Sequence, residues 1–377
     1  MIVNAGYRGK VGAAAPKFTY TGQYNVRKDG VVELLTSGTI VFLEPKVIDV
    51  FMVGGGGAGG HIGDNVTSVG CGGGGGGYTR TIRRISVTAN QSVPVTIGAG
   101  GSLRQAGGAS AFGPAYTVNG GATPALPGTS NTSPGAAGGS GGGGGVKSNS
   151  DYGAGGSDGA NGETGYPVAV AGGKGQGFTT REFGEATGKL YAGGGGGGRY
   201  MSAQNPVISM GGHGGGGAGA WCSSGNYQPA AAGVANTGGG GGGRATYASY
   251  NTPITAEAGT GGSGIVCFRD AAELPELAGT WVLNERLYAP ENDFAENINF
   301  KMTSIKGDVV GDRSKIFTEN NKIKFMIPIS ATSVYEMYDF TTNTWYHSQY
   351  LPKWIFPAGA TASDEFRAWL ASNATKQ

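Results

Sequence analysis

The chain has 377 residues, of which 78 are glycine, and only 14% of its residues are charged, with a formal net charge of +2. Glycine makes up roughly 7% of average proteins, so it is about threefold enriched here. The sequence has no Gly-X-Y period, which excludes collagen. The small net charge and the lack of a basic tract argue against a protein that binds nucleic acid.

The glycines form one block. Residues 54–264 hold 68 of them, and the flanking segments have ordinary compositions. This distribution predicts three parts: an N-terminal arm or attachment segment over residues 1–16, a glycine-rich domain over residues 17–270, and a C-terminal domain over residues 271–377.

The segments around the block predict β-strands. Apolar runs at residues 31–35 and 39–43 flank Thr36-Ser37-Gly38 and predict a hairpin, and residues 47–53 predict a buried strand that leads directly into glycine. Alternation over residues 85–88 and 93–97 predicts a second hairpin. Pro94 lacks an amide donor, which places its strand at a sheet edge. Residues 265–269 predict the strand that closes the block.

Within the block, glycine tracts alternate with loops. The tracts of four or more glycines are 54–57, 72–77, 141–145, 193–198, 214–217 and 238–243. Such tracts either stay flexible, as linkers do, or form extended helices with three residues per turn that pack side by side. The recurring tract length and the bracketing strands favour the ordered alternative, a bundle of polyglycine-II helices.

The C-terminal part predicts a small β-rich domain with one terminal helix. Strands are expected at residues 298–302, 323–329 and 334–338, with further strands within 345–356. Phe366, Trp369 and Leu370 form an i, i+3, i+4 stripe after the possible caps Thr361 and Ser363, which predicts the helix.

Several segments together resemble a known family. Residues 51–60 (FMVGGGGAGG), 93–101 (VPVTIGAGG) and 262–266 (GSGIV) resemble the glycine-rich domain of bacteriophage tail proteins, to which a module of anaplastic lymphoma kinase is related. The resemblance covers about residues 18–269 and implies a mainly β fold, a β-sandwich frame with inserted polyglycine-II helices. The glycine-rich region is also similar in principle to polyglycine-tipped phage adhesins, which bind host molecules through loops between the tracts. Residues 279–284 and 369–374 resemble a domain that ends phage tail-associated proteins.

The resemblance implies a non-enzymatic virion protein of a tail fibre, tail tip or baseplate, assembled in the host cytoplasm and released by lysis. Its expected partners are other virion proteins, further copies of itself (a trimer is common in fibres) and a host-surface glycan or protein. No cofactor, metal, nucleic acid or membrane insertion is expected. The alternatives are an architectural protein that decorates a head or tail, and a polysaccharide-degrading enzyme. The acidic residues available to an enzyme are Asp151, Asp158, Glu163, Glu182, Glu185, Glu291, Asp293 and Glu296.

Aromatic residues between the tracts are the candidate binding residues, because a sugar ring stacks on an aromatic face and tyrosine supplies rigid contact area. They are Tyr152, Trp221, Tyr227, Tyr247 and Tyr250. The alternative role for these rings is to cap the ends of the glycine bundle. The three cysteines, Cys71, Cys222 and Cys267, lack metal-type spacing and are expected to be buried thiols. His61 and His213 are expected to be exposed or hydrogen-bonded loop residues.

Overall fold

The computed structural model describes residues 17–62, 69–125, 134–145, 180–200, 209–223, 226–247, 254–276 and 278–283, and then 314–319, 322–328, 335–339, 344–348, 353–356 and 364–377. The chain divides into two compact units, one ending at Ala271 and the other beginning at Ala272. The described residues are mainly β, with several antiparallel sheets and very little helix, which confirms the predicted class. None of the helices in these ranges is long and apolar enough to cross a membrane.

The first unit contains two five-stranded antiparallel sheets, which we call the frame. The first and last strands of this unit, β1 and β16, both belong to the frame. The first sheet has the order β1 (Phe18–Tyr20), β4 (Gly38–Phe42), β8 (Ser92–Thr96), β9 (Ser110–Phe112) and β10 (Tyr116–Val118). The second has the order β2 (Tyr24–Val26), β3 (Val32–Leu34), β16 (Ile265–Asp270), β5 (Lys46–Val53) and β7 (Thr79–Val87).

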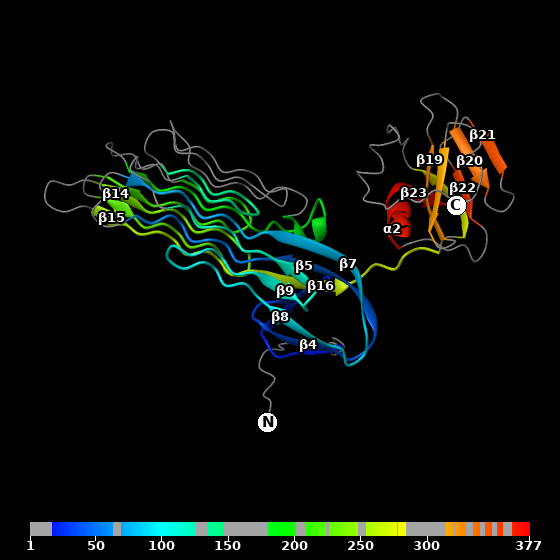
Figure 1. Ribbon diagram of the computed structural model, residues 1–377, viewed down its shortest axis with the longest axis horizontal. Coiled ribbons are helices and arrows are strands. Elements are labelled where there is room, and N and C mark those ends of the chain that lie inside the picture. The colour runs from blue at the N-terminus through cyan, green and yellow to red at the C-terminus, as the bar shows by residue number, and fades with distance from the viewer. Residues whose placement is uncertain are drawn as a thin grey trace. The chain divides into compact units, whose positions relative to one another are not determined.

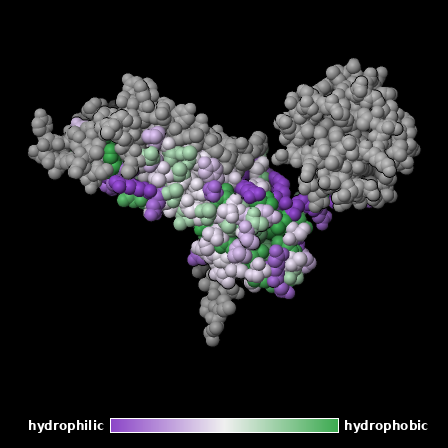
Figure 2. All heavy atoms as spheres, viewed as in Figure 1, coloured by the Kyte–Doolittle hydropathy of each residue, from purple (hydrophilic) through white to green (hydrophobic). Residues whose placement is uncertain are grey.

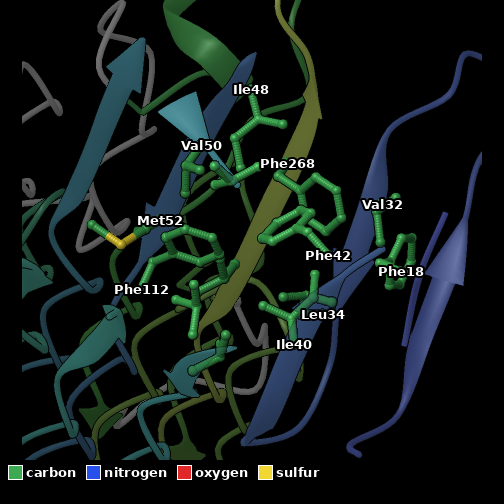
Figure 3. Packing of buried hydrophobic residues seen from close by; sticks show 14 of the residues in the cluster. Phe18, Val32, Leu34, Ile40, Phe42, Ile48, Val50, Met52, Phe112 and Phe268 are labelled. Carbon is green, nitrogen blue, oxygen red and sulfur yellow. The ribbon is translucent and has the colours of Figure 1, made fainter. Parts of the chain in front are cut away.

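One hydrophobic core takes side chains from both sheets of the frame (Figure 3). Ile40 and Phe42 come from the first sheet, and Leu34, Met52 and Phe268 from the second. The rings of Phe42 and Phe268 meet edge to face, with centroids 5.8 Å apart. The frame therefore supplies the ordinary side-chain core that the glycine block cannot provide.

The first expected hairpin is wrong. β3 lies in the second sheet and β4 in the first, so the two strands do not pair with each other. Leu34 and Ile40 are both fully buried in the shared core, because the chain crosses from one sheet to the other between them. Two hydroxyl groups stabilise this crossing. The hydroxyl of Thr36 accepts a hydrogen bond from the amide of Gln23, and that of Ser37 accepts one from the amide of Ile97.

The second expected hairpin is wrong for the same reason, since β7 and β8 lie in different sheets. The edge position expected for Pro94 is also wrong, because β8 lies between β4 and β9. The ladder between β8 and β9 includes only Val95 and Thr96. The carbonyl of Pro94 instead accepts a hydrogen bond from the amide of Gly113, in the turn after β9. Because Pro94 is not part of the ladder between β8 and β9, its missing amide hydrogen removes no hydrogen bond from that ladder.

The glycine tracts run side by side as extended segments away from the frame (Figure 1). Segment 54–60 shows how they are joined, by backbone hydrogen bonds of 2.8 to 3.0 Å from each of its amides. The acceptors, in order from Gly54 to Gly60, are the carbonyls of Tyr78, Gly108, Gly262, Gly75, Gln105, Gly259 and Gly72. Every third amide therefore bonds to the same neighbouring segment, and three neighbours are bonded in rotation.

The same segment also accepts hydrogen bonds from three further neighbours. Its carbonyls at positions 55, 56 and 57 accept the amides of Gly121, Gly101 and Gly241. Segment 71–78 repeats the period of three, since its amides at positions 71, 74 and 77 donate hydrogen bonds to the carbonyls of Arg244, Gly241 and Gly238. A central tract thus has six neighbours. The described surface of the tracts is mostly pale in the hydropathy view, which marks intermediate hydropathy (Figure 2).

Close backbone approach explains why these positions are glycine. A β-carbon added to Gly56 would fall on the carbonyl of Gly239, and one added to Gly75 on that of Ala137. In both cases the obstacle is backbone held by its own hydrogen bonds, so it cannot move aside as a flexible side chain would.

The second unit is a smaller sheet with a terminal helix. The sheet has the order β21 (Thr344–Ser348), β20 (Tyr335–Asp339), β22 (Lys353–Phe356), β17 (Gly279–Leu283) and β23 (Ala374–Lys376), and β18 (Ser314–Glu319) pairs with β19 (Lys322–Pro328). Helix α2 (Asp364–Asn373) lies where the sequence predicts it, with Leu370 fully buried and Arg367 bonded to the carbonyls of Leu274 and Pro275. The strand expected at residues 298–302 lies outside the described residues.

Replacing Gly75 with valine tests the packing of the tracts. The side chain would be forced into a neighbouring backbone, and overpacking costs typically about 1–3 kcal/mol, with the upper end expected where the obstacle is backbone. We expect the melting temperature to fall by roughly 6–12 °C. The control is Gly30→Asn, at a turn where φ is +83° and no atom lies within 4 Å of an added β-carbon. Equal melting temperatures for Gly75→Val and the wild type would contradict close packing.

Candidate functional site

The glycine tracts together form what we call the glycine segment, which runs away from the frame (Figure 1). Its far end carries two small sheets, which we call the tip. One sheet has the order β11 (Arg199–Tyr200), β12 (Trp221–Cys222) and β13 (Tyr227–Gln228), and the other has the order β15 (Ile254–Ala256), β14 (Ala245–Tyr247) and β6 (Val69–Gly70). β12 and β13 contact β14 and β15, so the two sheets are neighbours. Figure 1 shows β14 and β15 at this end.

Small side chains form the core of the tip. Ala220, Cys222, Ala245 and Ala256 are buried together, and Tyr247 packs against them. Three of these four side chains are single methyl groups, which lets the strands at the ends of the tracts stay close. The tip therefore continues the close packing of the tracts while allowing larger side chains at its surface.

The structure brings three of the five predicted binding residues to the tip. Trp221 is half-buried, and its Nε1 donates a hydrogen bond to Oε1 of Gln228 at 3.0 Å. Tyr227 is 58% exposed. Tyr247 is half-buried against the tip core, which is the capping position considered as the alternative role. Tyr152 and Tyr250 lie outside the described residues.

Trp221 and Tyr227 do not form one flat platform. Trp221 lies opposite Gln228 in the ladder, and Cys222 lies opposite Tyr227. Successive side chains along a strand point to opposite faces, so Trp221 and Tyr227 belong to different faces of the ribbon. Each ring would meet a ligand separately.

A charged cluster at the same end was not predicted as a group. Arg244 directly follows tract 238–243 and is fully buried, and its Nη1 donates to the carbonyl of Ile62. The same Nη1 lies 2.7 Å from Nε2 of His61, while Arg104 Nη2 lies 3.2 Å from Nδ1 of that ring. Oε2 of Glu257 lies 3.4 Å from His61 Nε2. Arginine side chains are donors only, and a neutral imidazole accepts at one ring nitrogen, so the ring of His61 accepts a hydrogen bond from one of the two arginines at a time.

This cluster ties together the ends of four segments. His61 ends segment 54–60, Arg104 lies in the loop after Gly101, Arg244 ends tract 238–243, and Glu257 follows β15. His61 is hydrogen-bonded, as expected from the sequence. An arginine directly after a six-glycine tract was the signal that could have identified the cluster.

No candidate metal centre emerges from the residues that the structure describes, which contain no group of three or more His, Cys, Asp or Glu placed to hold an ion. Two of the acidic residues considered for catalysis are described. Glu182 is buried, with Oε2 2.7 Å from Nη1 of Arg27, and Tyr191 donates a hydrogen bond to its Oε1. Glu185 pairs with Arg269. Both carboxylates belong to ion pairs that fix segment 180–192 on the frame.

The remaining acidic candidates lie outside the described residues. They are Asp151, Asp158, Glu163, Glu291, Asp293 and Glu296. His213 is exposed in a turn between tracts. The described part of the molecule therefore offers aromatic and amide groups at the tip as its candidate binding chemistry.

Comparison with known families gives one result. A family model described as a glycine-rich domain matches residues 36–270, which is more than half of the chain and extends from β4 through the tip to β16. None of the curated proteins matches the sequence.

The buried thiols give a prediction for chemical labelling. All three cysteines are buried thiols, as expected from the sequence. Burial raises the pKa of Cys222 from 9.0 to about 11 and that of Cys267 well above its ordinary value. Only the thiolate reacts with iodoacetamide, so we expect slow labelling of the native protein at pH 8 and fast labelling after unfolding. Fast labelling of the native protein, followed by mass spectrometry, would contradict this burial.

The same shift predicts how stability depends on pH. The folded state keeps the Cys222 proton that the unfolded chain loses above pH 9, so stability falls as the pH rises from 9 to about 11. Cys222→Ala should show a smaller loss of melting temperature over this window than the wild type. Identical curves would show that Cys222 does not contribute.

Proposed function

The chain belongs to the glycine-rich domain family, and we propose that it is a non-enzymatic structural protein of a bacteriophage particle, in a tail fibre, tail tip or baseplate. In this proposal the frame anchors the glycine segment, and the segment holds the tip toward the host surface. The observation that carries the proposal is the arrangement of the first unit: laterally bonded tracts that end in two small sheets with a half-buried tryptophan and an exposed tyrosine.

The proposal includes a finer description of the fold. The two five-stranded sheets would form a β-sandwich, supported by the core that they share. The tracts would be polyglycine-II helices, which have three residues per turn and no internal hydrogen bonds. The rotation of segment 54–60 among three acceptor neighbours with a period of three supports this assignment.

Such an architecture suits a receptor-binding role because the tracts are joined to one another mainly by backbone hydrogen bonds. Substitutions in the tip leave the hydrogen bonds of the tracts unchanged, so the tip can diversify while its support stays constant. Exposed side chains on a rigid support are typical of binding surfaces. We propose a host-surface glycan or protein as the receptor, with other virion proteins and further copies of this chain as assembly partners, and no cofactor.

A purely architectural role is the second candidate. The observation that favours it is Tyr247, whose ring packs on the tip core and so serves to close the end of the bundle. Under this alternative the protein would decorate a head or tail and contact no receptor.

Binding to host cells separates the two roles. Tyr227→Ala removes an exposed ring from the tip, and the matched control Leu43→Ala removes an exposed side chain from the frame, 52% exposed. For an adhesin we expect Tyr227→Ala to weaken binding of the purified protein about tenfold, near 1.4 kcal/mol, with the control unchanged. Binding should fall similarly for Trp221→Ala. Full binding by both tip variants, or a particle image that places the chain away from the host-facing end, would overturn the adhesin role.

A further inference from the structure

Three side chains with complementary binding chemistry form a row across the sheet of β11, β12 and β13. Arg199 on β11 lies in register with Trp221 on β12, and Trp221 lies in register with Gln228 on β13. Residues in register on neighbouring strands project from the same face of a sheet. One face therefore carries a guanidinium, an indole and an amide side by side, although the three residues are separated in the sequence.

This row lies on the face turned away from the tip core. The next position along β12 is Cys222, which is fully buried in that core. Because successive residues alternate between faces, the row with Trp221 points the other way. Gln228 is exposed and Trp221 and Arg199 are half-buried, whereas Cys222 is fully buried.

The hydrogen bond within the row determines what it can offer a ligand. The indole N–H is the only hydrogen-bond donor of a tryptophan side chain. In Trp221 it donates to Oε1 of Gln228, with 3.0 Å between Nε1 and Oε1. The bond fixes the orientation of the amide, whose NH₂ group keeps two donors for other acceptors. The indole is thereby held in place, and its ring face becomes the part that a ligand can contact.

An apolar ring face next to an oriented amide matches a saccharide. The C–H face of a sugar ring packs on an aromatic surface, while its hydroxyl oxygens accept hydrogen bonds from an amide. The third member of the row, Arg199, adds a planar cation that pairs with a carboxylate or a phosphate. A neutral sugar would use only two of the three groups.

We propose that Arg199, Trp221 and Gln228 form a binding site for a saccharide with an anionic substituent. The sugar ring stacks on Trp221, a hydroxyl accepts from Gln228, and the anionic group pairs with Arg199. This assignment rests on the proposed function for its biological setting, in which the tip meets the host surface, and it names the class of ligand recognised there.

Calorimetry on the full chain tests the proposal with three probes: trigalacturonate, which carries carboxylates, a mannopentaose phosphate, and neutral maltotriose. We expect one or both anionic probes to bind at least tenfold more tightly than maltotriose. NMR of the indole N–H signals should show the bound probe shifting the Trp221 signal, which Trp221→Phe identifies. Binding that is equal for all three probes, or that leaves the Trp221 signal unchanged, would overturn the proposal, as would no binding at all.

Variants assign the roles within the row. Arg199→Gln should lose the preference for the anionic probe, and Arg199→Lys, which keeps the charge, should retain part of it. Arg80→Gln, which removes an exposed cation from β7 of the frame, is the control and should bind as the wild type does. Melting temperatures verify that each variant is folded. A preference that survives Arg199→Gln would overturn the role of Arg199.

The outcomes distinguish this proposal from the proposed function. Failure of all saccharide probes together with host-cell binding that still depends on Tyr227 would overturn the row alone. Saccharide binding at Trp221 without any effect of Trp221→Ala or Tyr227→Ala on host cells would overturn the adhesin role and leave the row supported.

Discussion

The first unit depends on one constraint, that backbone segments approach more closely than a β-carbon would allow. Fixing a residue in one backbone conformation costs about 1–2 kcal/mol, whereas a hydrogen bond contributes a net 0.5–1.5 kcal/mol. Lateral bonds therefore only roughly offset the ordering of the tracts, and the remaining stability must come from elsewhere. The frame supplies it through its shared core, and Phe183 and Tyr191 dock segment 180–192 on Phe51, with ring centroids 6.1 and 5.3 Å from that of Phe51.

The same constraint explains how the fold relates to the sequence. Continuous apolar runs correctly indicated the frame strands β3, β4, β5 and β16, and alternating apolar residues indicated β8, whose apolar face alone is buried. The pattern does not show which strands pair. Short turns between two apolar runs suggested hairpins, but the two runs were buried in one core from opposite sheets, so the chain crossed between sheets at each turn. The recurring tract length and the bracketing strands favoured ordered tracts, whereas the neighbours of each tract depend on contacts distant in the sequence.

For the candidate site, the sequence identified single residues and missed their combinations. Trp221 and Tyr227 were singled out as aromatic residues among small and polar neighbours. Gln228 and Arg199 gained meaning only from the register of three short strands, which no local pattern encodes. The cluster around Arg244 was not predicted as a group either, because that residue meets His61 across 183 positions of sequence. Chemistry at the tip thus depends on how the tracts align their ends.

Amide hydrogen exchange of the tracts, resolved by NMR or by mass spectrometry of overlapping peptides, tests the central claim most directly. If lateral hydrogen bonds hold the tracts, the amides of residues 54–60 and 72–78 should exchange as slowly as those of β5 and β16, since all would require the same cooperative unfolding. Exchange of the tract amides at the rate of an unstructured chain, with β5 and β16 still protected, would show that the tracts are linkers and would contradict this account.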